Sequence, residues 1–238
     1  MPASIFLATA TAAALAGCPA PEAPIVDVTS EVSGVEIVRR TPREMEGLYD
    51  VAATMARRVH PVGLTHGDTH LDSTYTFLAV PTKNGQVCLW PKRIQVRVET
   101  ASIVSVSKDV GRNTCEWHAV LEHEMRHVEA DRMTAWRATF QIRDKMREAA
   151  IGYGPFNRAD MADAKLKLIA TLEASLKVAS DQMYAARDKA QDAVDSEEEY
   201  ARVASRCTFP DVFVVNGATA RGALLKNSLP SATFVRSD

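Results

Sequence analysis

The chain has 238 residues, a formal net charge of −2 at pH 7 and a hydrophobic content of 46 %. This length is typical of one domain, and this hydrophobic content excludes an intrinsically disordered chain. Lys and Arg nearly balance Asp and Glu and are scattered among them, so we expect no nucleic-acid partner.

An apolar, alanine-rich run over 5–16 has about the length of a signal-peptide core and is too short to span a bilayer. It ends in Leu15-Ala16-Gly17-Cys18, which resembles the lipobox of bacterial lipoproteins. The resemblance implies a signal peptide over 1–17, lipidation of Cys18 and a proline-rich tether over 18–24. The chain would then be an exported periplasmic or cell-envelope lipoprotein, anchored in the inner or outer membrane, or a secreted protein. The alternative is a cytosolic protein with an alanine-rich first helix.

Residues 25–209 predict one domain, and its first part is rich in strands. Ile25–Arg39 alternates apolar and polar residues and predicts one or two short strands. Thr41-Pro42-Arg43-Glu44 predicts the start of a helix that ends near Arg58, and His60–Ser73 predicts a loop. A turn at Asn84-Gly85 lies among further strands that would form an antiparallel sheet with one buried face. These strands are predicted at 74–80, 87–90, 94–98 and 103–106.

The second part of the domain predicts two long helices. No Pro or Gly occurs from Glu116 to Ala150, so a helix should run from Thr114 to about Ala150. Gly152-Tyr153-Gly154-Pro155 ends it, and apolar residues at spacings of three and four predict a second helix from Asn157 to Asp192 or beyond. The two helices would form an antiparallel helical hairpin, followed by a further helix over 196–206. Residues 210–238 lack clear periodicity and predict a loosely ordered C-terminal tail.

The first long helix contains a match to the motif HExxH at His123-Glu124-Met125-Arg126-His127. Residues four apart share a helix face, so His123 and His127 can offer their imidazoles to one metal ion. Glu124 would lie beside the metal, where it can take a proton from a water molecule. The motif therefore predicts a Zn²⁺ site in which Glu124 is the general base.

A hydrolytic zinc site needs a third protein ligand. Asp131 lies about 12 Å of helical rise beyond His123, too far to bind the same ion, so we expect it to accept a hydrogen bond from the other ring nitrogen of His127. An antiparallel second helix would return the chain to within one or two turns of the histidines near an acidic cluster.

That cluster contains Asp195, Glu198 and Glu199. We take Glu199 as the third ligand, with Asp195 and Glu198 as the alternatives; a solvated acidic helix start is the other interpretation of this cluster. Glu199 and Asp195 are four residues apart and would share a helix face. Tyr200 is expected near the site, where its hydroxyl could support a ligand or stabilise an oxyanion.

The stretch CEWHAVLEHEMRHVEADR, together with the preceding strands that carry Cys88, resembles the zincin-like proteins of bacterial cell envelopes. Zincins place HExxH on an active-site helix beside an antiparallel sheet, and gluzincins take the third ligand from a later helix. The metzincin extension HExxHxxGxxH is absent, because positions 130 and 133 are Ala and Met. The resemblance implies an α+β fold and a zinc peptidase in which Glu124 carries the proton from the attacking water to the leaving amine of a peptide or protein substrate.

Two other functions remain open at this level. The chain could be a non-catalytic envelope protein that binds a partner through its helices, with a structural metal or none. It could also be another zinc hydrolase that cuts an amide of the cell wall, since spacing in the sequence does not identify the scissile bond.

An exported protein is expected to have at least one disulfide among Cys88, Cys115 and Cys207. We prefer Cys88–Cys115, which would fix the start of the HExxH helix against the sheet. Cys115–Cys207 is the alternative pair, and three buried thiols would be the outcome without a disulfide.

Overall fold

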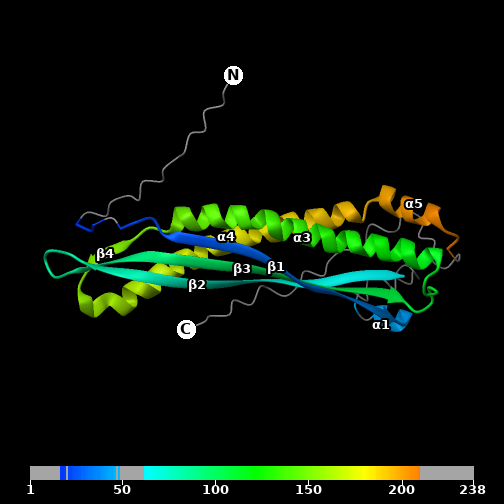
Figure 1. Ribbon diagram of the computed structural model, residues 1–238, viewed down its shortest axis with the longest axis horizontal. Coiled ribbons are helices and arrows are strands. Elements are labelled where there is room, and N and C mark those ends of the chain that lie inside the picture. Colours follow the sequence, from blue (N-terminus) through cyan, green and yellow to red (C-terminus); the bar gives the residue numbers. More distant parts are fainter. Residues whose placement is uncertain (1–16, 20, 47, 49–61, 210–238) are drawn as a thin grey trace, which may run out of the picture.

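The computed structural model describes residues 17–19, 21–46, 48 and 62–209. The predicted signal peptide and C-terminal tail lie almost entirely outside these residues, as does most of the helix predicted to end near Arg58. Figure 1 labels the elements in chain order. They are β1 (Ile25–Arg40), α1 (Pro42–Glu46), β2 (Gly63–Pro81), β3 (Val87–Ser107), α3 (Cys115–Ala149), β4 (Tyr153–Phe156), the 3₁₀ turn η1 (Arg158–Asp160), α4 (Met161–Val194) and α5 (Glu197–Arg206).

The fold is α+β, with a mixed sheet in which β3 is central. β2 pairs antiparallel with one edge of β3, while β1 and the short β4 pair with the other. β1 runs parallel to β3, so the predicted wholly antiparallel sheet is wrong. The physical reason is that alternation in a sequence identifies the buried face of a strand but carries no information on the direction of its partner.

The strands are longer than the sequence predicts. The loop predicted over His60–Ser73 is wrong from Gly63 onward, because β2 pairs with β3 through this whole segment. Gly67 explains part of this difference, since a Cβ at this position would lie 2.2 Å from the backbone oxygen of Ala101. Here the glycine permits close strand approach, whereas in the sequence it is a typical loop signal.

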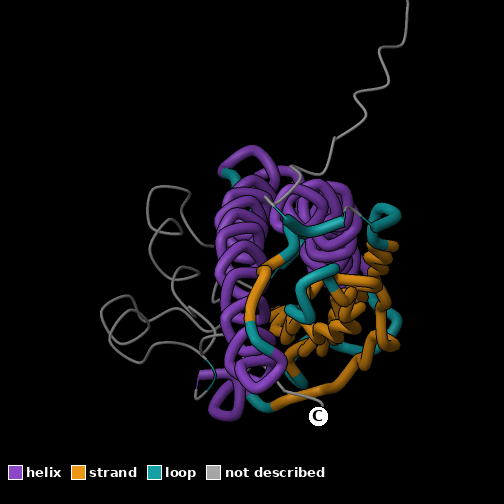
Figure 2. The backbone as a smooth tube through the Cα atoms, turned by 90° about the vertical axis from the view of Figure 1, so that its left-hand side faces the viewer, coloured by secondary structure: helices purple, strands orange, loops and turns teal. Residues whose placement is uncertain are grey.

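The helices pack on one face of the sheet, and the view along the long axis shows them on one side of the twisted strands (Figure 2). The buried positions of β3 alternate through Ile94, Val96 and Val98, which pack with α3 and α4 in the main core. The opposite face of the sheet carries charged pairs such as Arg93 with Asp27 and Arg97 with Asp72. One face of the sheet is thus buried and the other polar.

The sequence explains where the helices begin. Thr41 and Glu44 form the predicted capping box, in which each backbone N–H donates to the side chain of the other. Thr114 caps α3 by accepting from Trp117 N at 3.2 Å. Among the described residues, no helix is long and apolar enough to cross a membrane.

Two disulfides join the N-terminal segment and α5 to the body of the fold. Cys18 pairs with Cys88, and Cys115 pairs with Cys207. The preferred pair Cys88–Cys115 is therefore wrong, and the alternative Cys115–Cys207 is observed. Lipidation of Cys18 is also overturned, because the sulfur that a lipid thioether would need is already in the disulfide. Within the predicted tether, Cys18 is buried rather than solvated.

Replacing both Cys115 and Cys207 with serine should lower the free energy of unfolding by about 4 kcal/mol. The disulfide closes a loop between residues separated by 92 positions, and opening it frees the unfolded chain more than the folded one. Urea unfolding of the oxidised wild type and the double variant measures the difference. The wild type treated with reductant should move in the same direction, and unchanged stability in the double variant would contradict the prediction.

Candidate metal centre

The buried face of α3 carries polar side chains at steps of four residues. His123, His127 and Asp131 are only 5 %, 8 % and 4 % exposed. Their spacing places them on one side of the helix, which faces α4 and α5. A buried polar side chain needs a partner, and α4 provides partners in the opposite chain direction: Gln191 contacts His127, and Arg187 contacts Asp131.

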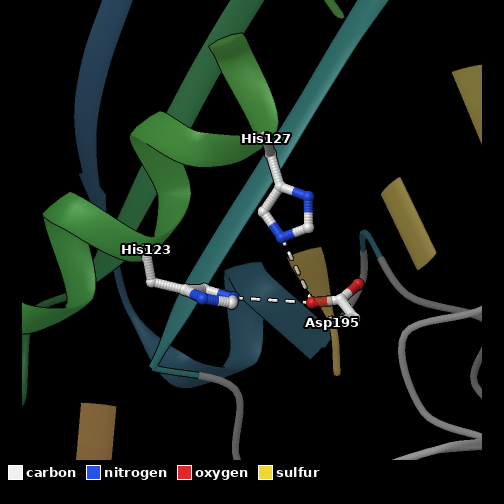
Figure 3. A group of neighbouring side chains, drawn as sticks. All are labelled: His123, His127 and Asp195. Atoms are coloured by element: carbon white, nitrogen blue, oxygen red, sulfur yellow. Dashed lines mark ion pairs between the residues drawn. The ribbon is translucent and has the colours of Figure 1, made fainter. Parts of the chain in front are cut away.

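Asp195 completes a cluster with the two histidines. It follows the last residue of α4 and directs Oδ1 between the two imidazoles (Figure 3). Oδ1 lies 3.4 Å from Nε2 of His123 and 3.2 Å from Nε2 of His127. Each of the three residues offers one ligand atom, and these atoms lie within 4.8 Å of one another.

This donor set fits a zinc ion. Zn–N and Zn–O bonds of about 2.0–2.2 Å in a tetrahedral arrangement place neighbouring ligand atoms about 3.3–3.5 Å apart. The two distances from Asp195 to the histidines lie close to that range. Two imidazole nitrogens and one carboxylate oxygen also form the ligand set typical of a catalytic zinc site. The residues present therefore fit the metal that the motif predicts.

The electrostatics of the cluster favour a positive charge at its centre. Burial disfavours the ionised form of Asp195, but hydrogen bonds with His123, His127 and Tyr200 hold its pKa below the usual range. Burial alone would lower the pKa of His127, but its hydrogen bond with Asp195 and the nearby charge of Glu124 raise this pKa to about 9. Protons thus bridge the cluster in the metal-free protein, and a divalent cation can take over that role.

Glu124 lies beside the cluster in a buried position between α3 and β2. Burial raises the pKa of its carboxyl group, while the charges of His127 and His123 oppose this shift. Thr65 on β2 donates to Glu124 Oε2 at 2.8 Å and fixes the carboxyl group. Gly63 permits the close approach of β2, because a Cβ there would lie 2.3 Å from Glu124 Oε1. The β2 backbone thus shapes the position of the predicted general base.

Glu199, predicted as the third ligand, lies on the other side of the His123 ring. Its Oε1 is 3.5 Å from Nδ1 of His123, not from Nε2. Arg202 donates to both of its oxygens at 2.7 and 2.8 Å, and Arg126 donates to Oε2 at 2.6 Å. The hydrogen bonds from Arg202 and the charge of Arg126 lower the pKa of Glu199 to about 2. The structure thus brings the alternative residue Asp195, rather than Glu199, to the position between the histidines.

The remaining predicted residues also have clear positions. Tyr200 donates to Asp195 Oδ1 at 2.7 Å, so its hydroxyl supports the carboxylate. Asp131 does not contact the His127 ring; it receives a hydrogen bond from Gln191, which does. Glu198 is exposed.

Sequence reasoning missed Gln191, Arg187 and Thr65. A signal for the first two exists, because Arg187, Gln191 and Asp195 repeat at steps of four residues and would share one face of the second long helix. Thr65 had no such signal, because its segment carries the glycines and polar residues of a loop.

Comparisons with protein-family models, with curated proteins and with solved structures find no match to this chain.

Proposed function

We propose that the protein is an exported zinc-dependent peptidase whose metal ligands are His123, His127 and Asp195 and whose general base is Glu124. One observation carries this proposal: Asp195 Oδ1 lies 3.4 and 3.2 Å from the Nε2 atoms of two HExxH histidines, next to the buried Glu124 carboxyl group. This is the arrangement that metal-assisted hydrolysis of a peptide bond requires.

Each side chain has a distinct task in this mechanism. When bound, zinc lowers the pKa of a coordinated water towards neutrality and polarises the substrate carbonyl. Glu124 accepts a proton on its carboxylate from the attacking water and delivers it to the leaving amine. Thr65 holds the Glu124 carboxyl group in place, and burial brings its raised pKa closer to the range useful for moving a proton both ways.

The second candidate is a non-catalytic envelope protein in which the same residues hold a structural metal. The observation that favours it is the burial of the ligand set, because the Asp195 side chain is only 14 % exposed and both histidines less. A closed ligand set is typical of structural zinc sites. Substrate cleavage therefore distinguishes the two candidates, whereas zinc binding alone does not.

Export is supported by the two disulfides, since such bonds persist in oxidising compartments. The N-terminal apolar run is consistent with a signal peptide. Because Cys18 is in a disulfide, the exported form we propose lacks a lipid on this residue.

The full chain purified in its oxidised form should contain about one zinc per molecule by elemental mass spectrometry. Incubated with a mixture of synthetic peptides, it should generate new termini detectable by mass spectrometry. A zinc chelator should stop this cleavage, and added zinc should restore it. Zinc bound without cleavage would support the structural-metal candidate, and no zinc uptake at all would overturn both.

A further inference from the structure

A buried chain of hydrogen bonds connects Arg187 to the ring of His127. Arg187 donates to both oxygens of Asp131, from Nε to Oδ1 at 2.7 Å and from Nη2 to Oδ2 at 2.9 Å. The Nε2 amide group of Gln191 donates to Asp131 Oδ1 at 2.5 Å and to the backbone oxygen of His127 at 3.1 Å. Gln191 Oε1 then contacts His127 Nδ1.

These contacts fix the orientation of the Gln191 amide. Its two neighbours on the Nε2 side, a carboxylate oxygen and a carbonyl oxygen, can only accept hydrogen bonds. A flipped amide would place its own oxygen against both of them and lose two hydrogen bonds in a buried site. Gln191 therefore presents an oxygen, and only an oxygen, to His127.

The orientation of the amide determines the state of the imidazole. An acceptor at Nδ1 requires that Nδ1 carry the proton, so that in the neutral ring the lone pair lies on Nε2. Nε2 is the nitrogen that faces Asp195 Oδ1 at 3.2 Å. The wrong tautomer would direct an N–H at the position where a metal is expected.

The Asp131–Arg187 pair is more than general stabilisation would require. Both groups are largely buried, with side-chain exposures of 3 % and 14 %. The desolvation of such a pair offsets much of its attraction, so its net contribution to stability is small. Its position at the end of the Gln191 contact gives it a specific task, which is to hold the acceptor that Gln191 Nε2 needs.

We propose that Gln191, held by Asp131 and Arg187, is a positioning residue that selects Nε2 of His127 as the metal ligand. This inference rests on the zinc site proposed above. His123 has a weaker equivalent, because the Glu199 oxygen at its Nδ1 is 3.5 Å away and engaged by two arginines. Selection through Gln191 is therefore expected to matter more for His127 than selection through Glu199 does for His123.

The test compares Gln191→Leu with Gln182→Leu, an exposed glutamine on the same helix. Zinc affinity is measured by competition with a chromogenic chelator, and long-range proton–nitrogen NMR of the zinc-loaded protein identifies the nitrogen of His127 that binds the metal. Gln191→Leu should weaken zinc binding about 10–100-fold, while Gln182→Leu should bind like the wild type. Circular dichroism of the metal-free variants checks that both are folded.

A paired exchange separates positioning from packing. Gln191→Glu alone removes both donated hydrogen bonds and brings two carboxylates together, so it should weaken zinc binding. Combined with Asp131→Asn, whose amide can donate to the new carboxylate, it should regain at least half of the lost binding free energy. A packing role alone would give no such recovery.

The outcomes distinguish this inference from the proposed function. A wild-type protein that does not bind zinc would refute the metal site itself. A wild type that binds zinc through Nε2 of His127, with unchanged affinity in Gln191→Leu, would overturn only the role of Gln191. Coordination through Nδ1 of His127 would also overturn it.

Discussion

Glu124→Gln should lower kcat/KM for peptide cleavage about 10²–10⁴-fold while the zinc content stays at the wild-type level. The substitution keeps the shape of the side chain and an oxygen that can accept from Thr65, but it removes the group that takes the proton. Because the structure buries this carboxyl group and raises its pKa, a neutral amide should be tolerated without loss of stability. Cleavage assays, zinc analysis and thermal unfolding of the same preparation measure the three effects.

The control for this variant is Glu129→Gln, which changes an exposed glutamate on the same helix. It should keep both zinc and activity. Wild-type activity in Glu124→Gln would exclude Glu124 as the general base, and loss of zinc would assign it a role in binding the metal.

Asp195→Ala should remove the stabilisation that zinc gives to the fold. Zinc at about 100 times its dissociation constant should stabilise the wild type by about 2.7 kcal/mol, because it binds the native state and not the assembled site of an unfolded chain. Asp195→Ala leaves two histidines without the carboxylate that lies 3.4 and 3.2 Å from them. At the same zinc concentration its unfolding midpoint should not respond to zinc.

Two neighbouring carboxylates provide matched controls. Glu198→Ala, at an exposed position, should respond to zinc like the wild type. Glu199→Ala should retain a reduced response, because it loses only the contact to Nδ1 of His123. If instead Glu199→Ala abolishes the response and Asp195→Ala preserves it, Glu199 is the ligand and the assignment made here is wrong.

The helical part of the fold was predictable because its signals are local. The absence of Pro and Gly after Glu116 and the cap at Thr114 define α3 within a residue at each end. Counting equal rise along two antiparallel helices also located the acidic cluster near the histidines. These predictions need only helix geometry and a short connection, both of which a single sequence contains.

The choice between two carboxylates was beyond the same reasoning. If one helix continued through this region, Asp195 and Glu199 would share a face. In the structure α4 ends at Val194, and Ser196 caps α5 by accepting from Glu199 N at 3.3 Å. The break places the two carboxylates at different nitrogens of His123. The spacing Ser196-x-x-Glu199 is that of a capping box, so a signal for the break was present.

The sheet and the disulfides depend on contacts between distant residues. The polar first half of β2 has weak strand propensity and is held by its pairing with β3. The parallel direction of β1 and the partner of each cysteine follow from how the chain returns in three dimensions. Sequence spacing contains neither, which is why the Cys88–Cys115 pair was wrong.

The opposed steps of four residues on α3 and α4 have a consequence for recognising related proteins. Each step forward from His123 to His127 to Asp131 is matched by a step backward from Asp195 to Gln191 to Arg187. The site can therefore be written as two short strings, HExxHxxxD and RxxxQxxxD, read from helices that run in opposite directions. A second chain that contains both, separated by one helical turn-around, would be a candidate for the same centre even where HExxH alone would be too common to be informative.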